Sequence, residues 1–95
     1  MLSVTKARYL GDYNILLSFN NGLSGTANLH DVIFNDKRPI FLPLRQENEF
    51  KNFKLGHDTI IWANELDLAP EFLFFITFKE NKEFQEQFKE WGYID

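Results

Sequence analysis

The fifteen residues of Thr59–Leu73, TIIWANELDLAPEFL, constrain the fold more than any other stretch of the chain. They begin with β-branched and aromatic residues, which suit a pleated and half-buried strand. Polar residues after Trp62 interrupt this run, and Pro70 stands where a helix accepts proline, in its first turn. The stretch therefore predicts a strand, a tight turn and a helix start in immediate succession.

Regular alternation earlier in the chain predicts a β-hairpin. Apolar side chains recur at every second position of 13–19, which is the period of a strand with one buried face. Asn21-Gly22 follows where the chain must turn, and both residue types tolerate the positive φ of a tight turn. We therefore expect residues 23–29 to return as the partner strand.

Similar patterns predict the remaining elements. A first strand is expected over 3–10, and a second hairpin pairs 53–55 with 59–62. Between the two hairpins, apolar spacing predicts short helices at 29–34 and within 45–53. The predicted fold is α+β, with a single antiparallel sheet of four to five strands, short helices in the middle of the chain and a C-terminal helical region.

The predicted C-terminal helix, at about 78–91, is amphipathic. Its apolar face carries three aromatic residues at spacings of four and three, Phe84, Phe88 and Trp91. We expect this stripe either to pack over the sheet, in the room left by the small residues Gly25 and Ala27, or to form a candidate interface with another chain. Aromatic residues are enriched in the cores of such interfaces.

Composition limits the classes of function. A chain of 95 residues is enough for one domain, 1–95. It has no cysteine, which excludes a disulfide framework, thiol catalysis and cysteine-ligated zinc. Its net charge of −4 argues against a nucleic-acid partner, because phosphate binding relies on basic residues. We expect a cytoplasmic protein with no membrane contact, since it lacks a signal-peptide pattern and any run near the roughly 20 apolar residues that span a bilayer.

Asp67 is the first candidate for a functional residue. A carboxylate at a helix start can hold a ligand or a metal ion, but it can also accept backbone N–H bonds as a cap, which we expect here. With Glu65 and Glu71 it forms an acidic cluster that lacks the spacing and the glycine of a calcium loop. We therefore expect no metal and no cofactor. Trp62 is expected in the core, with its indole N–H bonded to a backbone acceptor.

No catalytic constellation stands out. Each of the two histidines, His30 and His57, precedes an aspartate, but two histidines are too few for a metal phosphohydrolase. Neither Ser18 nor Ser24 lies in a nucleophile elbow, and the chain has no glycine-rich phosphate loop. We therefore expect that the protein is not an enzyme.

The order of these features resembles a known family. The shared motifs are Phe19-x-Asn21-Gly22, Phe41-x-Pro43-Leu44, Phe50 and, most specifically, Trp62-x-Asn64-x-x-Asp67-Leu68-x-Pro70-Glu71-x-Leu73. Over about 3–75, the chain is similar to the bacterial domain of unknown function 2442. The resemblance implies a small α+β domain with an antiparallel sheet and short helices. Within it we single out Trp62, Asn64, Asp67 and Pro70 as a structural motif.

Two positions depart from the family pattern. Members usually have Pro and then Asn-Gly after the tryptophan, whereas this chain has Ala63 and Glu65 at the proline and glycine positions. If that glycine serves a turn with positive φ, Glu65 must adopt another turn or carry strain.

The role of the family is not established, so the resemblance implies only a type of partner. Some members are encoded beside another small domain, in gene pairs that resemble toxin–antitoxin modules. We therefore expect a non-catalytic protein-interaction module, the antitoxin-like member of such a pair, which binds the product of the adjacent gene or forms a homo-oligomer. The alternative is a small-molecule or metal-binding regulatory domain that uses the Asn64–Asp67 turn.

Overall fold

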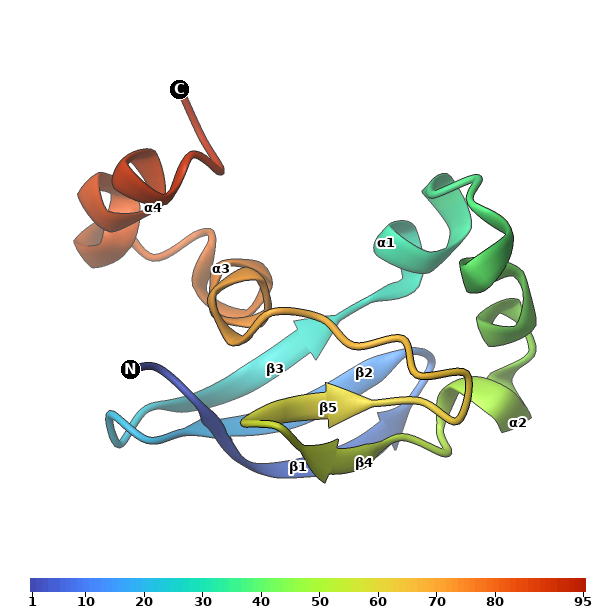
Figure 1. The fold of residues 1–95 in the computed structure, drawn as a ribbon. Coiled ribbons are helices and arrows are strands. Elements are labelled where there is room, and N and C mark those ends of the chain that lie inside the picture. The colour runs from blue at the N-terminus through green and yellow to red at the C-terminus, as the bar shows by residue number, and fades with distance from the viewer.

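Three strands at the start of the chain build the main sheet in a computed structural model that describes all residues 1–95 (Figure 1). β1 (Val4–Gly11) pairs with β2 (Asn14–Phe19), and β2 pairs with β3 (Ser24–Asn28), both antiparallel. Along β2 the apolar side chains of alternate positions are buried, as their period predicted. β3 is an edge of this sheet, because no other strand pairs with it.

The two hairpins of the main sheet close through different turns. Asp12 and Tyr13 have φ values of 52° and 66°, so β1 and β2 join through a two-residue turn in which both central residues are left-handed. Between β2 and β3 only Gly22 has a positive φ, of 87°. The Asn21-Gly22 signal thus predicted the β2–β3 hairpin correctly, although Asn21 itself does not adopt a positive φ.

A separate two-stranded sheet corrects the prediction of a single sheet with four to five strands. β4 (Lys54–Gly56) and β5 (Thr59–Ile61) pair only with each other. Their link to the main sheet is a hydrogen bond of 2.8 Å from the Val4 N–H to the carbonyl oxygen of Asp58. No residue of β4 or β5 pairs with β1, so the main ladder does not extend into this hairpin.

Short helices occupy the middle of the chain, as predicted. α1 (His30–Asn35) follows β3, and the 3₁₀ helix η1 (Pro39–Arg45) and α2 (Glu47–Phe50) come next. The Asn28 side chain accepts a hydrogen bond from the His30 N–H at 3.1 Å and so orders the start of α1. These elements lie beside the end of the sheet where β3 leads into α1 (Figure 1).

The C-terminal helical region is divided into three pieces. α3 (Pro70–Phe78) is followed by the 3₁₀ turn η2 (Lys82–Phe84) and by α4 (Gln85–Trp91). The predicted helix at about 78–91 is therefore shorter than expected. It is interrupted because the Asn81 side chain accepts a hydrogen bond from the Glu83 N–H at 2.9 Å and starts a new turn.

α3, and not α4, fills the space over the small residues of β3. A Cβ atom added at Gly25 would lie 2.7 Å from Cγ2 of Thr77 and 3.2 Å from the ring of Phe78, so glycine permits this close approach. α4 lies beyond α3, on the side away from the sheet (Figure 1). The expectation that the aromatic stripe covers Gly25 is thus wrong, because the end of α3 already occupies that place.

None of the helices combines the length and the apolar character that a bilayer crossing requires. The longest α-helix, α3, has nine residues.

Candidate functional site

The Trp62–Pro70 motif forms a corner between β5 and α3. Trp62 is buried at the end of β5, with 3% of its surface exposed. Its indole N–H donates to the carbonyl oxygen of Phe50 at 2.7 Å, and the two rings lie 5.7 Å apart. Pro70 is the first residue of α3. The motif therefore joins the second hairpin to both α2 and α3.

Asn64 orders the turn inside this corner. The Glu65 N–H donates to the Trp62 carbonyl oxygen, and the Trp62 N–H donates to the Leu66 carbonyl oxygen, both at 2.9 Å. Oδ1 of Asn64 accepts from the Leu66 N–H at 3.2 Å, and its Nδ2 donates to the carbonyl oxygen of Ile40 at 3.0 Å. One amide side chain thus closes the turn and fastens it to η1.

Glu65 adopts the left-handed backbone for which the family pattern supplies glycine. Its φ is 67°. A residue with a Cβ atom pays about 1–2 kcal/mol in that conformation relative to the right-handed one. Of the two outcomes foreseen for Glu65, the structure has the strained one.

Asp67 does not cap α3, contrary to expectation. Its side chain is exposed, and the residue at the N-cap position is Ala69, which makes no side-chain bond. The Asp67 backbone instead pairs with Ile61 in an antiparallel bridge. The carboxylate lies two residues too early for the cap position, and Pro70 has no N–H for it to bind.

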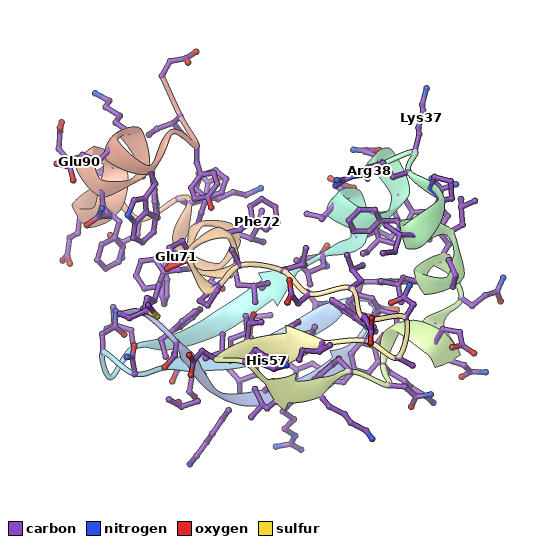
Figure 2. All side chains as sticks on the ribbon, in the orientation of Figure 1. Lys37, Arg38, His57, Glu71, Phe72 and Glu90 are labelled. Carbon is purple, nitrogen blue, oxygen red and sulfur yellow. The ribbon has the colours of Figure 1, made fainter.

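The Asn64–Asp67 turn does not form a single binding site, because its two ends face different hollows. Asn64 lines a hollow of about 330 Å³ beside Trp62 and Glu49. Asp67 lines another, of about 370 Å³, with Phe72 and residues of the α1–η1 region. Phe72 lies on the side of α3 that faces α1 (Figure 2). No group of three or more His, Asp or Glu side chains is placed to hold a metal ion.

The two histidines and the two serines take part in separate local contacts. His30 Nδ1 is 3.2 Å from Asp31 Oδ1, and the His30 ring stacks on that of Phe34 at 4.3 Å. His57 lies in the turn between β4 and β5, with a φ of 51° (Figure 2). The hydroxyls of Ser18 and Ser24 bond to each other at 2.9 Å, across the β2–β3 ladder.

Arg38 is the basic residue most tightly held by an acid. Its guanidinium Nη2 lies 2.6 Å from Oδ2 of Asp36, and its Nε also donates to that carboxylate. This hydrogen bonding lowers the pKa of Asp36, with a smaller contribution from the Arg38 backbone N–H. Asp36 and Arg38 both line the Asp67 hollow, and because they pair with each other they add no net charge to it.

The aromatic stripe, Phe84 at the end of η2 with Phe88 and Trp91 of α4, packs on α3. Phe88 is completely buried, while Phe84 and Trp91 are partly buried. The ring of Phe74 lies 5.1 Å from that of Phe84, 6.2 Å from that of Phe88 and 6.0 Å from that of Trp91. The stripe is thus joined to the core of its own chain through α3, with part of two rings left at the surface.

Tyr93 extends this aromatic cluster and was missed in the sequence. Its ring stacks on Phe75 at 5.0 Å, and its N–H donates to the carbonyl oxygen of Phe88 at 3.0 Å. Gly92, with a φ of 86°, turns the chain back after α4. The signal was present, because a glycine that ends a helix is often followed by an apolar residue that packs back on the last turn.

The outer face of the main sheet differs in charge from the rest of the molecule. The five strands contain no Asp or Glu, although the chain has 14 of these residues. Their charged residues are Lys6, Arg8 and Lys54, all exposed. The register sets Lys6 opposite Ser18 and Arg8 opposite Leu16. We call the surface that carries Lys6, Arg8, Leu16 and Ser18 the basic sheet face.

The basic sheet face also presents apolar side chains. Leu16 and Leu55 are 37% and 48% exposed. They line a shallow hollow of about 410 Å³ together with side chains of β1 and β2, namely Lys6, Ala7, Arg8 and Ser18. The absence of acids from the predicted strands was the signal for this face, but its residues come together only through the strand register.

Comparison with known proteins identifies the family. No curated protein and no solved structure matches the chain. The family described as protein of unknown function (DUF2442) matches residues 4–77, from the start of β1 to the last turn of α3. η2 and α4 lie beyond the matched region. The chain therefore belongs to the DUF2442 family, as its hairpin and tryptophan motifs indicated.

Proposed function

We propose that this protein is a non-catalytic protein-interaction module that binds an acidic surface of a partner protein with its basic sheet face. The observation that carries the proposal is the separation of charge. A chain with a net charge of −4 has strands without a single acid, and the basic residues of these strands are exposed.

The residues of this face supply the two ingredients of a protein interface. Leu16 and Leu55 offer apolar surface, whose burial contributes about 25 cal/mol per Å². Lys6 and Arg8 stand beside them and favour a partner of opposite charge, because complementary charges speed association and reject like-charged proteins.

A protein partner suits this face better than a nucleic acid. Its two basic side chains, Lys6 and Arg8, can neutralise few phosphates, and the salt-dependent affinity for nucleic acid grows with the number of phosphates bound. Exposed leucines add apolar area that a phosphate backbone does not use.

The first partner to test is the product of the adjacent gene, with this chain as the antitoxin-like member of the pair. Membership of the family motivates that choice. The charge of the basic sheet face adds a requirement, namely that the neighbouring protein present an acidic patch with apolar residues at its centre.

The experiment is coexpression with the adjacent gene product, followed by gel filtration and calorimetry. We expect a complex from the wild-type chain and a Kd at least about tenfold higher for the double variant Lys6→Glu/Arg8→Glu. The matched control is Lys82→Glu/Lys89→Glu, which changes the net charge equally but lies in η2 and α4. This control should bind as the wild type does.

Three results would overturn the proposal. The first is that the two proteins fail to co-elute, and the second is that the control variant binds as weakly as the sheet variant. The third is that the chain prefers single-stranded RNA to the adjacent gene product and loses its RNA binding in Lys6→Glu/Arg8→Glu.

A further inference from the structure

The edge of β3 carries backbone groups that bond to no strand. The Leu29 N–H donates to the Tyr13 carbonyl oxygen at 3.0 Å, and the Phe19 N–H donates to the Leu23 carbonyl oxygen at 2.9 Å. Residues that bond to a neighbouring antiparallel strand alternate along the ladder, so the odd-numbered residues of β3 bond to β2. The N–H and C=O groups that point away from the sheet belong to Ser24, Thr26 and Asn28.

β3 lacks three of the features that protect an edge strand, namely proline, charged side chains and a bulge. Its sequence, Ser-Gly-Thr-Ala-Asn, has no proline and no charged residue. Its register with β2 runs without a bulge, unlike that between β1 and β2. Natural edge strands usually carry such a block, because an unprotected edge is a template for another strand.

A groove lies beside this edge, and its lining comes from β3, α1 and the C-terminal end of α3. Its volume is about 540 Å³, and it is lined by Thr26, Asn28, Asp31, Val32, Ile76 and Lys79. α3 reaches β3 at Gly25, in the first half of the strand, whereas α1 begins just past the end of the strand. The groove therefore has its basic residue toward the start of β3 and its acidic residue toward the end.

We propose that this edge pairs with the same edge of a second copy of the chain, so that two main sheets continue into one. The two β3 strands would run antiparallel about a two-fold axis near Thr26. Each strand would then offer its outward N–H and C=O groups to the other, as strand addition requires. This edge is a different surface from the basic sheet face.

The distribution of charge selects a second copy as the occupant. Antiparallel pairing brings the start of one β3 to the end of the other. Lys79 of each copy then faces Asp31 of the other copy. The same operation sets Ile76 against Val32 of the second copy. Since β3 itself is uncharged, no like charges meet across the new ladder.

The test is the mass of the protein in solution, measured by analytical ultracentrifugation over a range of concentrations. Wild type should be a dimer, and Lys79→Glu and Asp31→Lys should each raise the dimer Kd at least about tenfold. The double variant Lys79→Glu/Asp31→Lys should restore the dimer, because it recreates both ion pairs in reverse. Lys82→Glu, which changes charge outside the groove, should leave the dimer intact.

Thr26→Pro tests the backbone pairing independently. Proline removes an N–H that points away from β2, so the chain should keep its circular dichroism spectrum while the dimer is lost. A wild-type chain that stays monomeric, a dimer that persists in Lys79→Glu and Thr26→Pro alike, or a double charge variant that remains as weak as the singles would each overturn the proposal. Binding of the adjacent gene product is judged separately, with the variants of the basic sheet face.

Discussion

The indole N–H of Trp62 donates to the main-chain carbonyl oxygen of Phe50 across 2.7 Å in the interior of the protein. This bond connects the corner after β5 to α2, two segments that neither sheet joins. A buried carbonyl that loses its donor costs about 1–3 kcal/mol, so this bond contributes to holding α2 in position, together with the packing of the Phe50 ring on Tyr9 and Tyr13.

Trp62→Phe should lower the free energy of unfolding by about 1–3 kcal/mol, because it keeps a ring in place but leaves the Phe50 carbonyl without a donor. Trp91→Phe is the control, since Trp91 is partly exposed and its contacts are with aromatic rings. Urea denaturation followed by circular dichroism measures both. An equal loss in the two variants would show that the bond to Phe50 is not the source of the effect.

Glu65→Gly should raise the free energy of unfolding by up to about 1 kcal/mol. The left-handed backbone costs a residue with a Cβ atom about 1–2 kcal/mol, and glycine avoids this cost. The greater conformational entropy of glycine in the unfolded chain reduces the gain by about 0.4–1 kcal/mol. Glu65→Ala removes the same charge and keeps the Cβ atom, so it should bring no gain. A gain of equal size from alanine would assign the effect to charge.

Asn64→Ala should cost about 0.5–1.5 kcal/mol, because it removes the bonds to Leu66 and Ile40. Asp67→Ala should stay within about 0.5 kcal/mol of wild type, since that side chain is exposed and caps nothing. Thermal and urea unfolding decide between them. A large loss at Asp67 would mean that its carboxylate caps the start of α3 in solution.

Phe88→Ala should lower the free energy of unfolding by about 3–5 kcal/mol, because the ring is completely buried against α3. Phe84→Ala should cost clearly less, as Phe84 remains partly exposed. Urea unfolding with analytical ultracentrifugation separates stability from assembly. If Phe84→Ala changed the mass in solution without changing stability, the stripe would belong to an interface.

Alkaline pH should destabilise the fold through its three tyrosines. Burial is the main cause that raises the pKa of Tyr9, and the hydrogen bond that its hydroxyl donates to Glu47 adds to it. Burial also raises the pKa of Tyr13 and of Tyr93. The folded state holds these protons more tightly than the unfolded chain does.

The contribution of the tyrosines to stability is therefore complete below a pH of about 10 and is lost as the pH rises through the folded-state pKa values. The free energy of unfolding, measured against pH, should fall above that point, and Tyr9→Phe should make the fall shallower. Phenolate absorbance offers an independent check. Ionisation of all three tyrosines at their ordinary pKa in the folded protein would contradict this prediction.

Local patterns predicted the elements of this fold better than their assembly. The β2–β3 and β4–β5 hairpins follow from strand-forming residues and turn residues, which act between neighbours in the chain. The division into two sheets does not, because it depends on how β1 meets the distant β4–β5 hairpin, which it contacts at the Asp58 turn and not along a strand. The spacing of the aromatic stripe is likewise local and was visible in the sequence, whereas its packing on α3 is a tertiary contact and was not.

The candidate site divides in the same way. The sequence predicted that the indole N–H of Trp62 bonds to a backbone carbonyl. Only the tertiary structure identifies that carbonyl as the one of Phe50. The cap expected at Asp67 failed because the bridge with Ile61 sets the backbone before the helix begins. The strained backbone of Glu65 was foreseen as one of two outcomes, since the family pattern supplies glycine there.

The aromatic face of α3 is covered by a segment that is synthesised after it. A nascent chain emerges from its N-terminus, so α3 leaves the ribosome before the helix that covers its phenylalanine face. During that interval, the rings of Phe74 and Phe75 lack the Phe84 and Phe88 rings that pack on them in the finished protein. A chain that ended at residue 78 would leave this phenylalanine face uncovered for good, so η2 and α4 act as the cover that completes the folding of α3.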